Sequence, residues 1–260
     1  MEKRIVIGLP AYNEEAALPK LFEKLKVLRK KMGSRMDVLV VNDGSTDRTG
    51  EILKANSGKY EYVHYINNSK NMGLGEAVKI LINTAIDKYS DNDILVTLDA
   101  DNTHDPFIIS DMCLKLYRES LDLVVASRFT PGSMENGVPL IRKLFSRGAL
   151  IFFKTFFPIA NITDYSSGFR AYNIGYLRKA AEIYRNRLIT TNGFDCMAEL
   201  LAKFCKIGIR AGEFPLILQY DLKEGKSKMN IPKTIKGYFM LLAKVQMPLA
   251  SKDSVESLYK

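Results

Sequence analysis

Tryptophan is absent from this sequence of 260 residues, and cysteine and histidine are scarce, at three and two residues. The cysteines are odd in number and form no CxxC pair, which argues against a disulfide framework or a zinc site and favours a reducing compartment. No window of 18 residues is free of charge, so we predict no transmembrane helix. The N-terminal segment has too short an apolar core for a signal peptide. These absences predict a cytoplasmic, globular protein.

Two nucleotide-binding motifs are also missing. The pattern G-x-G-x-x-G breaks at Val78, which stands where a third glycine should follow Gly73 and Gly75, and GxxxxGK[ST] does not occur. A dinucleotide oxidoreductase and a P-loop enzyme are therefore poor interpretations. A sugar-phosphate nucleotidyltransferase would need a glycine-rich loop with a basic residue after the first strand, and Pro-Ala-Tyr-Asn-Glu stands there instead.

Acidic residues are scarce in the second half of the chain. The whole sequence has a net charge of +9, but residues 1–125 carry 17 basic and 19 acidic side chains, whereas residues 126–260 carry 21 and 10. This asymmetry, −2 against +11, indicates that the second half meets an anion such as nucleic acid, a membrane surface or a phosphorylated substrate. No recognised nucleic-acid-binding motif is present, so we expect no nucleic-acid partner. An ordinary basic surface is the alternative.

The first 126 residues contain a regular alternation of strand-like and helix-like segments. Apolar runs of strand character cover residues 4–9, 37–41, 62–66, 93–98 and 121–126. Segments with helical period lie between them at 15–31, 47–55, 75–88 and 106–118. This alternation predicts an α/β fold with a Rossmann-like, doubly wound and mostly parallel sheet. The sequence has no linker or repeat, so we expect one domain with a helical C-terminal extension.

Polar or glycine-rich sequence follows each of the five predicted strands. Ligands of doubly wound sheets bind beyond the carboxyl ends of the strands, so these segments predict one shared site. Tyr12 is suited to stacking on a nucleobase, Glu14 to binding ribose hydroxyls and Asp43 to accepting hydrogen bonds from the base. The alternatives are core packing for Tyr12, a first-turn helix charge for Glu14 and a backbone turn for Asp43. Gly73 and Gly75 precede a predicted helix, as in a phosphate-approach loop.

Asp99 and Asp101 stand two residues apart directly after a predicted strand. Two hard oxygen ligands this close suit Mg²⁺ or Mn²⁺ shared with a diphosphate, and the cation would neutralise charge on a leaving group. His104 follows and is a candidate for holding the metal or the diphosphate. A capped turn before Pro106 and a solvated histidine are the alternatives.

Taken together, these segments resemble the inverting glycosyltransferases of family two, which have the GT-A fold. In the second half the resemblance is to the polyprenyl-phosphate hexosyltransferases, of which dolichol-phosphate mannosyltransferase is typical. Thr103 stands where that group often has glutamine, which leaves the third metal ligand open. The Gln-x-x-Arg-Trp motif of processive polysaccharide synthases is absent. The matching motifs are Pro10-Ala11-Tyr12-Asn13-Glu14-Glu15, Asn42-Asp43-Gly44-Ser45-Thr46-Asp47, Lys70-Asn71-Met72-Gly73-Leu74-Gly75, Leu98-Asp99-Ala100-Asp101, Ser127-Arg128-Phe129, Asp164-Tyr165-Ser166-Ser167-Gly168-Phe169-Arg170 and Gly225-Lys226-Ser227-Lys228-Met229.

The resemblance covers roughly residues 4–235 and implies a GT-A catalytic domain at 1–230 with a helical extension at 231–260. Residues 1–126 would bind the nucleotide and residues 127–230 the acceptor. Asp99 and Asp101 would bind Mg²⁺ or Mn²⁺, and the catalytic residues would be Asp101, Arg128 and Asp164. The nucleotide-binding residues would be Pro10, Tyr12, Glu14, Asp43, Gly73, Gly75, Asp99, Ala100 and Asp101. The acceptor-phosphate residues would be Arg128, Arg142, Ser146, Ser167, Lys223 and Lys228.

The implied activity is inverting transfer of a hexose from a UDP- or GDP-linked sugar to a dolichyl or undecaprenyl phosphate at the cytoplasmic membrane face. A phosphate monoester is already an anion near neutral pH, so it needs little help from a general base, and positioning with electrostatic stabilisation would do most of the work. The alternative is a soluble enzyme with a sugar or cell-envelope hydroxyl as acceptor. Such an acceptor needs a base, for which Asp164, Asp195 and Glu199 are candidates.

Phenylalanine is concentrated in residues 144–162, and residues 128–156 carry five basic side chains and one acidic side chain. Apolar and basic side chains together are typical of helices that lie in a membrane interface, and residues 236–247 form a shorter example. We therefore expect a peripheral protein that binds an anionic membrane surface. A membrane-protein partner is compatible with this expectation. Core packing and a dimer interface are the other interpretations of the phenylalanine-rich segment.

Overall fold

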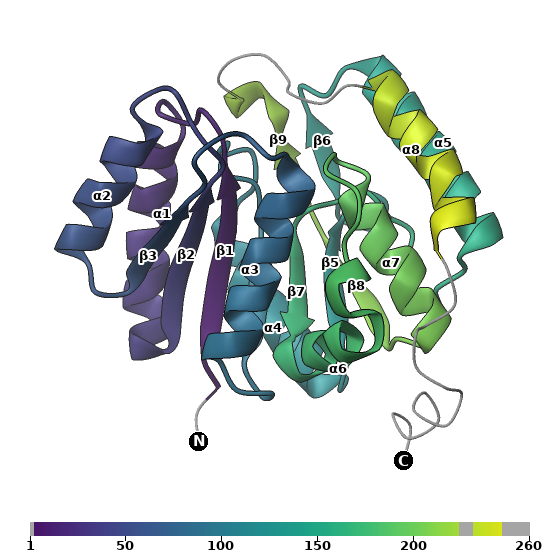
Figure 1. The fold of residues 1–260 in the computed structure, drawn as a ribbon, viewed down its shortest axis with the longest axis horizontal. Helices are drawn as coiled ribbons and strands as arrows, with labels where there is room; N and C mark the ends of the chain where they lie inside the picture. Colours follow the sequence, from purple (N-terminus) through teal and green to yellow (C-terminus); the bar gives the residue numbers. More distant parts are fainter. Residues whose placement is uncertain (1–2, 224–230, 246–260) are drawn as a thin grey trace.

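The computed structural model, which describes residues 3–223 and 231–245, has a seven-stranded central sheet flanked by helices (Figure 1). The strand order is β3-β2-β1-β4-β7-β5-β8, and every pairing is parallel except those of β7 with β4 and β5. The strands of this sheet are β1 (Ile5–Ala11), β2 (Met36–Asn42), β3 (Val63–Asn67), β4 (Ile94–Thr97), β5 (Leu123–Ser127), β7 (Arg170–Asn173) and β8 (Ala211–Pro215). A second sheet pairs β6 (Met134–Asn136) with β9 (Ile217–Gln219) in parallel.

Helices cover both faces of the central sheet. They are α1 (Leu18–Met32), α2 (Thr49–Lys59), α3 (Leu74–Lys88), α4 (Ile109–Arg118), α5 (Leu140–Phe156), α6 (Ile174–Tyr184), α7 (Cys196–Ile207) and α8 (Ile231–Lys244). Short 3-10 turns are η1 (Gly33–Arg35), η2 (Pro106–Ile108), η3 (Arg185–Arg187) and η4 (Tyr220–Leu222). The predicted α/β fold with a mostly parallel sheet is confirmed.

The five strands and four helices predicted for the first half are present, with shifted ends. Helix α1 begins three residues later than predicted, because Pro19 lies in its first turn and Asn13 has a left-handed φ of 51°. The predicted helix at 106–118 begins as the 3-10 turn η2, where the Asp105 carboxylate accepts a hydrogen bond from Phe107 N at 3.0 Å. These departures come from local turn chemistry at the segment ends.

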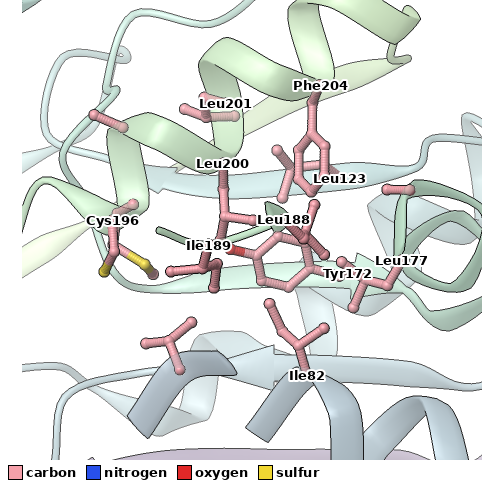
Figure 2. Close-up of a cluster of buried hydrophobic side chains, with 14 of the residues drawn as sticks. Ile82, Leu123, Tyr172, Leu177, Leu188, Ile189, Cys196, Leu200, Leu201 and Phe204 are labelled. Carbon is pink, nitrogen blue, oxygen red and sulfur yellow. The ribbon is translucent and has the colours of Figure 1, made fainter. Parts of the chain in front are cut away.

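The sheet buries an apolar layer on each face because successive side chains of its strands point to opposite sides. On β2, Leu39 and Val41 belong to one core, and Val38 and Val40 to the other. The first core lies under α3, α6 and α7, and Figure 2 shows part of it, including Ile82 of α3 and Phe204 of α7. The second core lies under α1 and α4. Because both faces of the sheet are covered, a ligand can approach it at the edge formed by the carboxyl ends of the parallel strands.

Strands from the second half complete the sheet of the first half. The short strand β7 lies between β4 and β5, and β8 pairs with the far side of β5. The division at residue 126 therefore crosses a continuous sheet, and a split between nucleotide and acceptor binding stays a prediction about function.

Helices α5 and α8 lie side by side at one edge of the molecule (Figure 1). Aromatic contacts join them, with Phe145 stacked on Tyr238 at 5.8 Å and Phe152 against Phe239 at 5.2 Å between ring centroids. Core packing accounts for part of the phenylalanine-rich segment, since Phe153 of α5 is fully buried. No helix in residues 3–223 or 231–245 is both long enough and apolar enough to cross a membrane.

Candidate functional site

A cavity of about 430 Å³ opens beyond the carboxyl ends of β1, β2 and β4. Side chains and backbone from both halves of the chain line it. Among the predicted site residues, those that line the cavity are Pro10, Tyr12, Glu14, Asp43, Gly73, Asp99, Ala100, Asp101, Arg128, Arg142, Ser146, Ser167 and Lys223. Gly75 and Asp164 lie outside this lining, and Lys228 lies outside the described residues.

The loops after β1 and β2 are fastened to each other. Asn13 N donates to Ser45 Oγ at 2.9 Å, and the Asn13 carboxamide oxygen accepts from Thr46 N at 2.8 Å. Glu14 N donates to Thr49 Oγ1 at 2.8 Å. These bonds hold the backbone on both sides of the turn. The segment that presents Tyr12 and Glu14 to the cavity is therefore fixed in place.

Asp43 is buried and organises the loop that follows β3. Its carboxylate accepts hydrogen bonds from Asn68 Nδ2 at 2.8 Å, Met72 N at 3.0 Å and Gly73 N at 2.8 Å. A carboxylate has about four acceptor positions, so most of this capacity holds the loop. Gly44 has a φ of 68°, and a Cβ there would meet the backbone of Lys70 at 2.2 Å. Nucleobase binding by Asp43 stays a prediction that relies on its remaining acceptor capacity.

Gly73 and Gly75 allow a close approach between the start of α3 and the segment at 191–192. A Cβ on Gly73 would lie 2.3 Å from Asn192 O, and one on Gly75 would lie 1.7 Å from Thr191 O. Gly75 N also donates to Asn192 O at 3.1 Å. Gly75 packs against the segment at 191–192 and is not itself part of the cavity lining, so its predicted nucleotide binding stays a prediction. This contact brings Asn192 and Phe194 to the cavity wall.

Asp99 and Asp101 both line the cavity. Asp101 accepts hydrogen bonds from Thr103 N at 3.1 Å and Thr103 Oγ1 at 2.7 Å, and its other carboxylate oxygen contacts Lys223 Nζ. Burial opposes ionisation of Asp101, but Lys223, His104 and Thr103 outweigh it and hold the pKa of this carboxyl below its ordinary value. The Asp101 carboxylate therefore faces the cavity as an anion.

These two carboxylates fit a hard divalent cation. No group of three His, Cys, Asp or Glu side chains within residues 3–223 and 231–245 is arranged to hold a metal ion. Mg²⁺ commonly binds one or two carboxylates and takes its other ligands from substrate phosphates and water, which matches this donor set. Thr103 Oγ1 already donates to Asp101, so it orients that carboxylate. His104 Nδ1 is buried and has no hydrogen-bond partner within the described residues, while its ring packs against Phe169.

Asp164 lies behind Arg128 and is completely buried. Its carboxylate accepts from Arg128 Nε at 2.7 Å and Nη2 at 2.6 Å, and Arg128 Nη2 also donates to Ser166 Oγ at 2.7 Å. Burial raises the pKa of Asp164, but Arg128 and backbone N–H groups outweigh this and lower it overall. This two-point contact fixes the guanidinium in the cavity wall. The geometry gives Asp164 a positioning role, in contrast to the catalytic role predicted from the sequence.

The two further base candidates occupy different environments. Asp195 lines the cavity, and burial together with the charge of Glu199 raises the pKa of its carboxyl. Glu199 is fully buried, pairs with Lys203 Nζ at 2.5 Å and is not part of the cavity lining.

Sequence reasoning missed cavity residues on α8 and on the segment before α7. They are Asn192, Gly193, Phe194, Lys233, Thr234 and Tyr238. The apolar and basic character of residues 236–247 pointed to a surface helix, and nothing in that pattern indicated which side of the helix meets the cavity. The predicted residues Arg142 and Ser146 line the cavity from α5. Arg142 packs over the Tyr220 ring at 5.2 Å, and Ser146 Oγ donates to Lys143 O at 3.1 Å.

Comparison with known proteins places this arrangement among sugar-transferring enzymes. Residues 6–180 match the model of the family "Glycosyl transferase family 2". A dolichol-phosphate mannosyltransferase of Pyrococcus furiosus is 31% identical over 201 residues, which cover 77% of this chain, and the chain spans about half (53%) of that relative's length. An undecaprenyl-phosphate mannosyltransferase of Micrococcus luteus is 29% identical, with 87% of this chain and 88% of the relative covered.

The fold also matches a solved structure. Glucosyl-3-phosphoglycerate synthase from Mycobacterium tuberculosis, in complex with Mn²⁺ and UDP-glucose, superposes with a TM-score of 0.63 at 20% identity and covers 95% of this chain and 80% of its own. At this identity the likeness shows the shared GT-A fold.

Proposed function

Because the chain belongs to glycosyl transferase family 2, we propose that it transfers a hexose, with inversion, from a UDP- or GDP-linked sugar to a dolichyl or undecaprenyl phosphate. Two relatives named as polyprenyl-phosphate mannosyltransferases support this acceptor class. The family assignment makes the chain a glycosyltransferase. The sugar, the donor and the lipid belong to the proposal.

The observation that carries the proposal is the two-sided character of α5 and α8. From these helices Arg142, Ser146 and Lys233 line the cavity. The same helices carry nine of the sixteen large apolar side chains that are exposed in the described part of the chain. A polyprenyl phosphate has the same division, with an anionic head and an apolar tail, so its head would enter the cavity while its tail stays with the apolar surface. The exposed side chains are Leu140, Ile141, Leu144, Ile151 and Phe156 of α5 and Ile235, Phe239, Met240 and Leu242 of α8.

In this proposal the donor occupies the first-half side of the cavity. Tyr12, Glu14 and Asp43 hold the nucleoside, and Asp99 and Asp101 hold the cation. A bound Mg²⁺ or Mn²⁺ supplies positive charge that stabilises the departing nucleoside diphosphate. The two neighbouring carboxylates, Asp99 and Asp101, support the proposal that the reaction depends on this metal.

The acceptor phosphate needs position more than a base. Its second pKa lies near 6, so at neutral pH an anionic oxygen is available to attack the anomeric carbon. Arg128, fixed by Asp164, and Arg142 bind the phosphate and hold it against the sugar. Attack on the face opposite the leaving diphosphate inverts the configuration. The residues of this chain thus contribute orientation and charge neutralisation.

The proposal includes peripheral binding to the cytoplasmic face of a membrane through α5 and α8. Lys143, Arg147, Lys154 and Lys236 accompany the exposed apolar side chains on these helices and suit an anionic surface. Such docking would bring the cavity to the level where a lipid phosphate group lies.

A radiolabel assay with UDP- and GDP-sugars, Mg²⁺ or Mn²⁺ and a short polyprenyl phosphate tests the function. We expect lipid-linked product from one donor class and at least a hundredfold loss in Asp101→Ala, because one of two metal carboxylates is removed. Asp111→Ala, an exposed carboxylate on α4, is the matched control and should keep full activity. Absence of product with every donor, or product unchanged in Asp101→Ala, would refute the proposal.

The same assay tests a second candidate, a sugar-hydroxyl acceptor. Asp195 favours it, because a carboxylate with a raised pKa in the cavity wall is suited to general-base catalysis. If a hydroxyl is the acceptor, product forms without lipid phosphate and is lost in Asp195→Asn. If a phosphate is the acceptor, Asp195→Asn retains most of its activity.

A further inference from the structure

Lys223 reaches into the cavity and contacts the carboxylate that is central to the candidate metal site. Its ammonium group contacts Asp101 Oδ2, and the two side chains are only 14% and 10% exposed. The two residues are 122 positions apart in the chain, so the fold, and not local sequence, brings them together.

Neighbouring structure holds Lys223 in this place. It follows η4, and its backbone N donates to Tyr220 O at 3.1 Å. Gln219 N, at the end of β9, donates to Thr103 O at 3.0 Å, which ties this segment to the loop that carries Asp101. Gly137 packs against the backbone of Asp221, where a Cβ would come within 2.9 Å. The small β6–β9 sheet and the turn that follows it therefore hold Lys223 beside the carboxylates.

The ammonium group lies among the carboxylates expected to attract a divalent cation. Lys223 Nζ forms an ion pair with Asp101 Oδ2, and Asp99 and Glu14 line the same cavity. Thr103 occupies Asp101 Oδ1 with two hydrogen bonds. Asp101 Oδ2 is thus the oxygen with capacity for a cation, and Lys223 contacts it.

One carboxylate oxygen in a partly buried site does not accommodate an ammonium group and a divalent cation together, since like charges at this distance repel strongly. We propose that Lys223 is the counter-ion of Asp101 in the metal-free protein and yields this oxygen when a divalent cation binds, so that metal loading frees an ammonium group for a phosphate oxygen in the same cavity. This inference rests on the metal-dependent transfer proposed above.

Mn²⁺ titration followed by electron paramagnetic resonance, without nucleotide, tests the competition directly. Lys223→Met removes the charged end of the side chain and keeps most of its length, so we expect Mn²⁺ to bind about tenfold more tightly than to the wild type, or roughly 1.4 kcal/mol. Lys223→Arg keeps the charge and should stay within about twofold of the wild type. Lys115→Met, which removes a surface ion pair with Glu119 outside the cavity, is the matched control and should not change the affinity.

Thermal unfolding supplies a second measurement that registers any folding defect. Without metal, Lys223→Met leaves Asp101 uncompensated and should unfold at a lower temperature than the wild type, and Mn²⁺ should raise its melting temperature by more than it raises that of the wild type. Equal or weaker Mn²⁺ binding by Lys223→Met overturns the inference and leaves metal-dependent transfer standing. If no variant binds Mn²⁺ even with UDP present, both the metal dependence and this inference are wrong.

Discussion

Glu199 of α7 is fully buried, and its two oxygens accept hydrogen bonds from five donor groups. Four of them are the N–H and hydroxyl groups of Thr190 and Thr191, and the fifth is the ammonium group of Lys203. Thr191 directly precedes the segment that forms part of the cavity wall. Glu199 therefore anchors the base of that wall from within the core.

The charge of Glu199 gives stability a defined pH dependence. Burial raises its pKa, but Lys203 and the hydrogen bonds from Thr190 outweigh burial and lower it below its ordinary value. A carboxyl whose folded pKa is depressed contributes stability that is complete above its unfolded pKa and is lost as pH falls through the folded value. We expect Glu199→Gln to lower the free energy of unfolding by about 3 kcal/mol at pH 7, because Lys203 is left unpaired.

Urea unfolding at pH 7, 6, 5 and 4 measures this effect. The difference between wild type and Glu199→Gln should begin to shrink as pH drops below about 4.5. Glu119→Gln removes the surface pair with Lys115 and should cost less than about 1 kcal/mol at pH 7. A pH-independent difference, or equal costs in the two variants, would contradict the role assigned to Glu199.

The sequence identified carboxylates that are suited to a site, but it did not show which of them face the cavity and which are paired inside the protein. Asp99 and Asp101 line the cavity because the end of an apolar strand determines their place. Asp164 and Glu199 have the same carboxylate chemistry and were also predicted as site residues, yet each is paired inside the protein. Lys203, the partner of Glu199, looks like an ordinary surface cation in a sequence with 38 basic residues, and nothing in the sequence pairs Arg128 with Asp164. Only tertiary packing reveals which charges are buried.

Among the structural elements, α3 depends on the glycine at its start. A Cβ on Gly75 would come within 1.7 Å of Thr191 O, and backbone on both sides leaves little room to relax. We expect Gly75→Ala to lower the free energy of unfolding by about 2 kcal/mol, as overpacking does, and to weaken binding of the proposed donor nucleotide, UDP or GDP, because the loop before α3 shifts. Urea unfolding and titration with both nucleotides measure the two effects.

Gly58→Ala is the matched control, because it lies within α2 and a Cβ there meets nothing within 4 Å. Alanine favours a helix over glycine by about 1 kcal/mol, so this variant should be as stable as the wild type or more stable. Loss of stability in both variants, or in neither, would show that the contact with Thr191 does not restrict residue 75.

The elements of the first half follow from periodicity, whereas several of the second half do not. Strand β7 is only four residues long and contains Arg170, which is fully buried. Its two terminal nitrogens donate to Met197 O at 2.8 Å and Tyr165 O at 2.9 Å inside the core, while Nε has no hydrogen-bond partner within the described residues. A charged side chain within a short segment conceals the strand from any analysis of apolar runs. The β6–β9 sheet is hidden for a similar reason, since its strands have three residues each.

For the whole molecule, the charge asymmetry and the exposed apolar side chains should act together at a membrane. We expect Leu144→Glu on α5 to reduce binding to vesicles of anionic lipid about tenfold, because a leucine side chain contributes about 1.5–3 kcal/mol when it is buried. Leu144 is 67% exposed and does not line the cavity. Co-sedimentation with vesicles measures the bound fraction.

Leu114→Glu on α4 is the control, since Leu114 is exposed on a different helix. It should bind vesicles as the wild type does, and both variants should transfer sugar equally well to a water-soluble, short-chain acceptor. Equal vesicle binding by the two variants would exclude α5 as part of the docking surface.

The position of β7 has a consequence for how the chain is made. Strand β4 obtains its second neighbour, and β5 its first, only when residues 170–173 are in place. During synthesis from the N-terminus, both strands therefore emerge with open hydrogen-bonding edges that invite pairing with other chains. The sheet closes late, through contacts distant in sequence, which slow folding. A fragment that ends near residue 126 would keep those edges open permanently, so isolating the nucleotide-binding half requires β7 to be supplied as well.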